Sequence, residues 1–248
     1  MKKFGLIGHP IAHSLSPALF KAAYDGKYAY DLIEGEDFET SYRRFIEEYD
    51  AINVTAPFKE AAFAKADILS EECASTGATN LLVKTPDGIK AYNSDFLGVR
   101  MWLSEVTEDL KGVKILIVGL GGAGKAAAAA AESLGMDVIR MNRTVRDSQT
   151  HPLDDFRKCF RKANIIIYNI PAAIPELKEL TDSDFNEDKP KLILEANYKD
   201  PSLRETMESF GSKAVYTGGE TWLLYQAMTG YKILTGEKPD LTKMSDVL

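Results

Sequence analysis

A glycine turn lies between an apolar run and an alanine-rich run near the middle of this 248-residue chain. Residues 115–118 read Ile-Leu-Ile-Val, and Gly119, Gly121 and Gly124 follow them in the spacing G-x-G-x-x-G, ahead of six alanines at 126–131. The first glycine permits a tight turn, the second lets the backbone approach a pyrophosphate, and the third lets the helix pack against its strand. The strand and helix on either side favour a dinucleotide-binding turn over a glycine turn that binds nothing.

The segment after the next expected strand indicates which nicotinamide cofactor is bound. An NAD enzyme usually places Asp or Glu there to hold the ribose 2'-hydroxyl, but this chain has Asn142-Arg143-Thr144, with Asn142 23 residues after Gly119. A guanidinium pairs with a 2'-phosphate through charge-assisted hydrogen bonds. The pattern therefore favours NADP, and the alternative is that Arg143 is only a solvated surface residue.

The rest of the chain alternates short β-rich runs with helical patterns, which predicts an α/β fold whose mainly parallel sheets are covered by helices. We expect the first helix to have Ser16 as its cap and Pro17 at its first position. The expected strands are 3–8, 28–33, 51–55, 80–83, 113–118, 137–141, 163–168 and 191–196, and the expected helices are 17–24, 38–49, 95–106, 123–134 and 220–235.

Two βα series in succession predict two domains. Residues 1–97, completed by C-terminal helices at about 220–248, form the expected substrate and catalytic domain, and residues 98–219 form a Rossmann-type dinucleotide-binding domain. The helix expected at 95–106 connects them. We expect the last helix to fold back on the first domain and leave a cleft between the two.

Composition and charge exclude several classes of protein. A formal net charge of −7 argues against a broad surface for nucleic acid. The N-terminal apolar stretch, broken by His9 and Pro10, is too short for a signal peptide, and no run is long enough to span a membrane. Cys73 and Cys159 stand far apart, which predicts neither a disulfide nor a metal site. We therefore expect a soluble, cytoplasmic protein without a nucleic-acid or membrane partner.

Three polar clusters lie at strand or loop ends of the expected first domain: residues 14–17, residues 53–59, and Asn80 with residues 93–95. Such a set of hydroxyls, amides, one amine and one carboxylate suits a polyhydroxylated small molecule, because each buried ring hydroxyl requires a hydrogen-bond partner. Each member also has a structural alternative. Ser16 and Asp95 can be helix caps, and Lys59 can be an exposed lysine in a first helical turn.

Six short patterns in this order resemble the shikimate dehydrogenase family over nearly the whole chain. They are Ser14-x-Ser16-Pro17, Asn53-Val-Thr-x-Pro-Phe-Lys59, Gly77-Ala-x-Asn80, Asn93-x-Asp95-x-x-Gly98, Gly119-x-Gly-Gly-Ala123 and Asn142-Arg143-Thr144. The resemblance implies reversible, NADPH-dependent reduction of 3-dehydroshikimate to shikimate in aromatic amino-acid biosynthesis, by a monomer or a homodimer.

The resemblance also implies a role for individual residues. Ser14 and Ser16 would hold the substrate carboxylate, and Lys59 and Asp95 would be the catalytic pair, with the Lys59 ammonium suited as general acid. In the oxidation direction the amine must have lost its proton, directly or by relay through Asp95. Lys59 and Asp95 would also contact the substrate, and further contacts would come from Thr55, Asn80, Tyr198 and Gln226. Contacts to the cofactor would come from Gly119, Gly121, Gly122, Ala123, Gly124, Asn142, Arg143, Thr144 and Gly219.

The departures from the family pattern gather on the cofactor side. Arg146 followed by Asp147 shifts a second arginine by one position, Asn169-Ile170-Pro171 lacks a loop hydroxyl, and Trp222 replaces a methionine, while Leu81 replaces a threonine after Asn80. Two alternatives stay open: a quinate/shikimate-type dehydrogenase with relaxed cofactor or substrate use, and a non-catalytic NADP-binding sensor of the same fold. Retention of both Lys59 and Asp95 weighs against the sensor.

Overall fold

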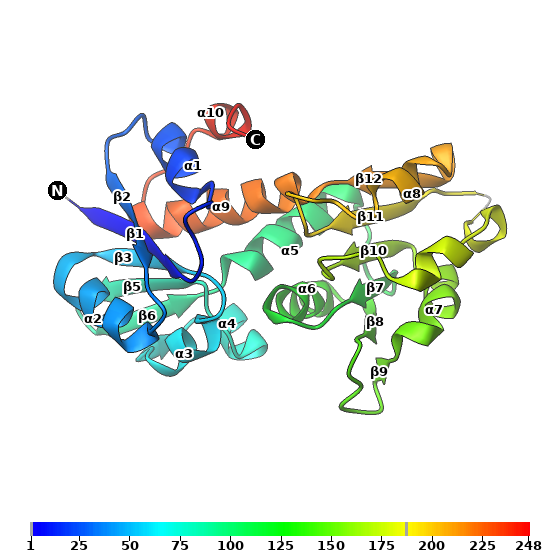
Figure 1. The fold of residues 1–248 in the computed structure, drawn as a ribbon, viewed down its shortest axis with the longest axis horizontal. Coiled ribbons are helices and arrows are strands. Elements are labelled where there is room, and N and C mark those ends of the chain that lie inside the picture. Colours follow the sequence, from blue (N-terminus) through cyan, green and yellow to red (C-terminus); the bar gives the residue numbers. More distant parts are fainter. Residues whose placement is uncertain (1, 187) are drawn as a thin grey trace. The chain divides into compact units, whose positions relative to one another are not determined.

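A computed structural model describes residues 2–186 and 188–248 of the chain. The chain divides into two compact units, Met1–Gly98 with Leu224–Leu248, and Val99–Leu223. Each unit contains a six-stranded sheet with helices on its faces (Figure 1). The predicted α/β class with two mainly parallel sheets is confirmed. Within the described ranges, no helix has both the length and the apolar character needed to cross a membrane.

The sheet of the first unit has the strand order β2-β1-β3-β5-β6-β4. Only β5 runs antiparallel to its neighbours, β3 and β6. The β5–β6 hairpin turns at residues 86–87, and the next residue, Gly88, has a φ of +123° that suits glycine. The strands are β1 (Lys3–Gly8), β2 (Ala29–Glu34), β3 (Ala51–Val54), β4 (Ile68–Leu69), β5 (Leu81–Thr85) and β6 (Gly88–Tyr92).

Helices pack on both faces of this sheet. On one face, Phe45 of α2 and Cys73 of α4 join Ile7 of β1 in a buried apolar cluster. On the other face, the Phe20 ring of α1 lies 5.4 Å from the Phe4 ring and 4.9 Å from the Tyr231 ring of α9 (centroid distances). The helices are α1 (Ser16–Ala23), α2 (Phe38–Glu48), α3 (Lys59–Ala64), α4 (Glu71–Thr76), α5 (Ser94–Val106), α9 (Gly219–Thr235) and α10 (Leu241–Ser245), with α5 and α9 each continuing into the second unit.

The sheet of the second unit has the order β12-β11-β10-β7-β8-β9, and all of its strand pairs are parallel. Its central strands are near-continuous apolar runs, as expected for a sheet buried on both faces. The strands are β7 (Lys114–Val118), β8 (Asp137–Met141), β9 (Thr150–His151), β10 (Ile165–Tyr168), β11 (Lys191–Glu195) and β12 (Ala214–Thr217), and the α-helices are α6 (Gly122–Ser133), α7 (Phe156–Lys162) and α8 (Arg204–Glu208). Short 3₁₀ turns span Leu153–Asp155, Pro175–Glu179, Asp182–Asp184 and Gly211–Lys213.

A lysine is fully buried at the start of β11. The Nζ of Lys191 donates hydrogen bonds to the carbonyl oxygens of Arg161 and Ala163 at the end of α7, and it lies 5.2 Å from the centroid of the Phe160 ring. Burial lowers the pKa of Lys191 to about 8, although the charge of Asp184 acts in the opposite direction. The folded protein therefore loses this proton at a lower pH than the unfolded chain does.

We predict that Lys191 contributes roughly 2 kcal/mol more to the stability of the second unit at pH 10 than at about pH 7.5. This contribution to the free energy of unfolding rises with pH because, in this range, the unfolded chain binds the Lys191 proton more strongly than the folded protein does. Urea unfolding of the wild type and Lys191→Met at both pH values tests it, since all other titrating groups are common to both proteins. A stability difference between them that stays constant with pH would contradict the prediction.

Candidate functional site

The three polar clusters of the first unit meet at one edge of its sheet. The parallel strands β1 and β3 both end there, so the segment after Gly8 lies beside the segment that begins at Thr55. The Thr55 amide donates to the Ile7 carbonyl oxygen at 2.8 Å. Because β5 is antiparallel to β3, its beginning lies at this same edge, and β6 ends beside it. Asn80 and residues 93–95 therefore join the other two clusters.

An ion pair joins two of these clusters. Lys59 is the first residue of α3, and its Nζ donates to the Oδ2 of Asp95, in the first turn of α5. The two side chains are 21% and 14% exposed, so a small molecule can still reach them. The alternative of Asp95 as a helix cap is wrong. Asn93 takes that position, because its Oδ1 accepts the Phe96 amide at 3.2 Å.

A buried hydrogen-bond chain runs from Asn80 to Gln226. Asn80 Nδ2 donates to Ser94 Oγ at 3.0 Å, and the Ser94 amide donates back to Asn80 Oδ1 at 2.7 Å. Ser94 Oγ donates to Gln226 Oε1 at 3.1 Å. Ser94 belongs to the third polar cluster of the sequence, but the sequence pattern gives it no role of its own. Ser94 connects two predicted substrate residues.

Two glycines allow the helices that carry this chain to approach closely. A Cβ on Gly98 of α5 would lie 2.7 Å from the Gln226 amide nitrogen, and a Cβ on Gly230 of α9 would lie 3.1 Å from Ser94 Oγ. Real Cβ contacts are almost never as short as the first. Gln226 consequently reaches the site from a part of the sequence that is 132 residues beyond Ser94.

The predicted carboxylate-binding serines lie together at the start of α1. Ser14 Oγ donates to Ser16 Oγ at 3.2 Å and accepts the Ser16 amide, also at 3.2 Å. The prediction that Ser16 caps the helix is wrong, because α1 begins at Ser16 and its cap position is Leu15. Ser16 is itself the first residue of the helix, and its amide donates to the Ser14 side chain. Both hydroxyl groups are partly exposed.

Two further predicted residues lie in the second unit. Tyr198 follows β11 in a segment held at its base by the buried Glu195 carboxylate, which accepts the Ser202 amide at 2.6 Å and the Tyr216 hydroxyl at 2.7 Å. Gly219 is buried, and a Cβ there would lie 2.5 Å from the Ala196 carbonyl oxygen. The remaining predicted substrate residues all belong to the first unit, as do Lys59 and Asp95.

The glycine turn of the second unit has the conformation that its spacing predicts. Gly119 has a φ of +88°, and a Cβ on Gly124 would lie 1.8 Å from the Gly119 carbonyl oxygen, so only glycine lets α6 approach β7 there. A Cβ on Gly121 would meet no described atom within 4 Å. The backbone at Gly121 is thus open to a ligand, at the amino end of a 12-residue helix whose first amide groups suit an anion.

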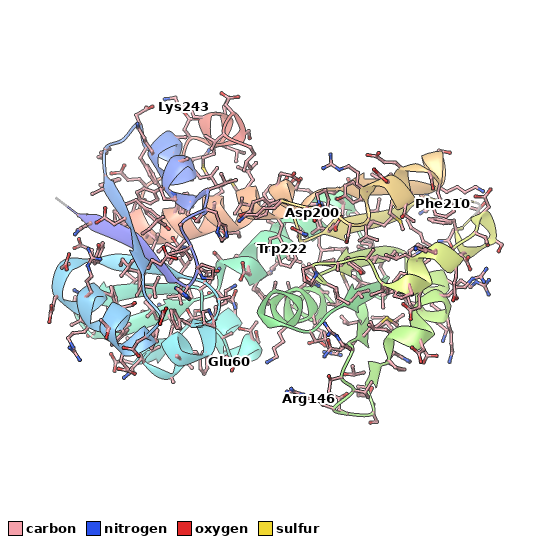
Figure 2. The ribbon with its side chains drawn as sticks, in the orientation of Figure 1. Glu60, Arg146, Asp200, Phe210, Trp222 and Lys243 are labelled. Atoms are coloured by element: carbon pink, nitrogen blue, oxygen red, sulfur yellow. The ribbon has the colours of Figure 1, made fainter. Side chains whose placement is uncertain are left out.

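Asn142 connects the glycine turn to the loop after β8. Its Oδ1 accepts the Leu120 amide at 3.3 Å, and its Nδ2 donates to the Thr144 carbonyl oxygen at 3.2 Å. Arg143 and Thr144 are exposed beside it, and Arg146 lies farther along the same exposed loop (Figure 2). An open glycine turn next to an exposed guanidinium fits a dinucleotide that carries an additional phosphate.

Two segments that depart from the family pattern occupy different surroundings. Asn169 lies against the glycine turn, where its Nδ2 donates to the Val118 carbonyl oxygen at 3.3 Å, and a Cβ on Gly119 would lie 3.0 Å from Ile170 Cγ1. Trp222, in the first turns of α9, is buried (Figure 2). The substitution at 169–171 therefore adjoins the turn directly.

Family models match both parts of the chain. A model described as the shikimate dehydrogenase substrate binding domain matches residues 6–82. A model described as the NAD binding domain of D-isomer specific 2-hydroxyacid dehydrogenases matches residues 89–194. The two matches do not overlap, and they follow the chain in the order of its two sheets.

Individual relatives match almost the full length. The shikimate dehydrogenase (NADP(+)) of Staphylococcus aureus is 31% identical, covering 98% of this chain and 96% of that protein. The enzyme of the same name from Thermotoga maritima is 30% identical, over 93% and 92%. The crystal structure of shikimate 5-dehydrogenase from Thermus thermophilus with NADP(H) and shikimate gives a TM-score of 0.81 at 26% identity, covering 100% of this chain and 98% of that chain.

Proposed function

Since this chain belongs to the shikimate dehydrogenase family, we propose that it catalyses the reversible, NADPH-dependent reduction of 3-dehydroshikimate to shikimate. The observation that carries the proposal is the partly exposed Lys59–Asp95 pair, which lies at the same sheet edge as hydroxyl and amide groups suited to a hydroxylated acid. We assign substrate binding to residues 1–97 with 220–248, and NADP binding to residues 98–219.

Apart from the Lys59–Asp95 pair, the groups that hold the substrate are neutral hydrogen-bonding groups. The Ser14 and Ser16 hydroxyls, 3.2 Å apart, bind its carboxylate. Asn80 and Gln226, which Ser94 holds in place, bind ring hydroxyls together with Thr55. Tyr198 of the second unit is a further proposed substrate contact. Because each polar group of the substrate needs a partner when buried, this set selects an acid with several hydroxyls over an apolar ketone.

Lys59 supplies the proton. When bound, NADPH provides the hydride, and the reduced carbonyl oxygen then requires a proton, which the Lys59 ammonium donates as general acid. Asp95 holds the ammonium in place through their direct hydrogen bond. In the oxidation direction the Lys59 amine accepts the alcohol proton, and Asp95 is positioned to relay it.

Residues of the second unit hold the cofactor. The segment Gly119 to Gly124 binds the pyrophosphate with backbone amides of the α6 amino end, and Arg143 pairs with the 2'-phosphate. Asn142 and Thr144 fix the loop on which Arg143 lies. Gly219 is assigned to the cofactor site as well.

The direct test mixes the purified protein with shikimate or quinate and with NADP⁺ or NAD⁺ separately, and follows the absorbance of reduced nicotinamide. We expect the highest kcat/KM with shikimate and NADP⁺. Preference for quinate or for NAD⁺ would indicate the quinate/shikimate-type alternative. Tight NADPH binding without turnover of either substrate would indicate a sensor.

We predict that Lys59→Ala lowers kcat by about 10²- to 10⁴-fold and raises the KM for shikimate far less, because the proton is needed in the transition state. Lys65→Ala is the matched control, since Lys65 directly follows the last residue of the same helix and pairs with Glu39 on the surface at 2.9 Å. Steady-state kinetics of both variants measure kcat and the KM for shikimate and so test the prediction. Unchanged turnover in Lys59→Ala would remove Lys59 from the chemistry.

We predict that Arg143→Ala weakens NADPH binding by at least about tenfold and leaves NADH binding nearly unchanged, because only NADPH carries the phosphate that Arg143 binds. Fluorescence titration of the two cofactors measures both dissociation constants, so NADH is the internal control. Arg146→Ala tested in parallel shows whether a second arginine contributes. Equal losses for the two cofactors would contradict the assignment of Arg143.

A further inference from the structure

Two tyrosines from distant parts of the first unit lie against the Ser14–Ser16 turn. Tyr231, on α9, is buried, and its hydroxyl donates to the Ser16 carbonyl oxygen at 3.0 Å. Tyr30, on β2, donates its hydroxyl to Asn53 Oδ1 at 2.8 Å. The Ser16 side chain lies beside both phenol groups. The role of these tyrosines was not apparent from the sequence.

The Ser16 backbone is fixed on both sides. Its amide donates to Ser14 Oγ at 3.2 Å, and its carbonyl oxygen accepts the Tyr231 hydroxyl. The Tyr231 ring is itself held by Phe20, whose centroid is 4.9 Å away in an edge-on arrangement, and by Tyr30 at 6.1 Å. Because the Tyr231 ring is packed in this way, its hydroxyl has little freedom to move. The position of α9 therefore fixes the position of the Ser16 carbonyl group.

Protonated phenols are compatible with an anion nearby. Burial raises the pKa of Tyr231 and Tyr30 well above the usual value, and the adjacent Ser16 hydroxyl offsets only part of that effect. Both tyrosines are therefore neutral at pH 7 and bring no negative charge toward a bound carboxylate. Ionised phenols at these positions would repel a carboxylate bound at Ser16, whereas the neutral phenols do not.

We propose that Tyr231 is a positioning residue for the acid-binding serines: its hydroxyl fixes Ser16 so that the Ser14 and Ser16 hydroxyls stay 3.2 Å apart and bind one carboxylate together. This inference rests on the proposed function, because it requires a substrate that carries a carboxylate. According to this inference, α9 positions two parts of the substrate site, because it holds Ser16 through Tyr231 and also places Gln226 against Ser94.

The test removes one hydroxyl. Tyr231→Phe keeps the ring contacts and is expected to raise the KM for shikimate by about 3- to 10-fold, with kcat within about twofold of the wild type. Tyr24→Phe is the matched control. Tyr24 is also buried and lies 5.1 Å from the same Phe20 ring, but its hydroxyl contacts Thr235 and Glu237 instead of Ser16. Its KM is expected to stay at the wild-type value.

A double-mutant cycle separates positioning from general stability. If Tyr231 acts through Ser16, then Tyr231→Phe made in Ser16→Ala changes KM by less than about twofold, because the group that it positions is gone. A merely structural role predicts the same fold-change in both backgrounds, accompanied by equal shifts in thermal unfolding. An additive cycle, or an unchanged KM in Tyr231→Phe, overturns the inference while the wild type remains active. A wild type that neither oxidises nor binds shikimate overturns the proposed function itself.

Discussion

The close packing of α9 on α5 is the contact on which the candidate substrate site depends. It depends on the missing side chain of Gly98, and Gly230 also lies close to Ser94, so that Gln226 reaches Ser94 across 132 residues of sequence. The same helix carries Tyr231 to Ser16. The C-terminal segment is therefore part of the first unit's hydrogen-bond network. Its removal would take away the partners of Ser94 Oγ and of the Ser16 carbonyl oxygen that Gln226 and Tyr231 provide.

The single reversed strand has an equally large effect on the site. If β5 were parallel to β3, Asn80 would lie at the opposite edge of the sheet from Thr55. Its reversal, followed by the hairpin to β6, returns the chain to the edge where β1 and β3 end, and α5 begins there with Asp95. The Lys59–Asp95 pair is thus a consequence of sheet topology more than of any local sequence preference.

What the sequence predicts well is local, and what it misses depends on tertiary contacts. The strand, turn and helix around Gly119 follow from residue pattern alone, because Gly119 needs its positive φ and Gly124 its close contact with the Gly119 carbonyl oxygen. The cap of α5 did not follow, since Asn93 and Asp95 are both good cap residues and only the chain's path selects the first. Tyr231 gives no signal at all, because a tyrosine on an apolar helix face is ordinary until its hydroxyl is seen to reach Ser16.

Two lysines show why the position and accessibility of a side chain locate such a site better than a shifted pKa does. Lys191 has the lowered pKa that is often associated with function, yet its Nζ faces backbone carbonyl oxygens at the end of α7 and a phenyl ring, where a substrate has no access. Lys59 is partly exposed, is paired with a carboxylate, and lies at the sheet edge where the polar clusters of the first unit meet. The shifted pKa of Lys191 shows only that this lysine is buried. The candidate active site is identified instead by accessible polar side chains that meet at one edge of the sheet.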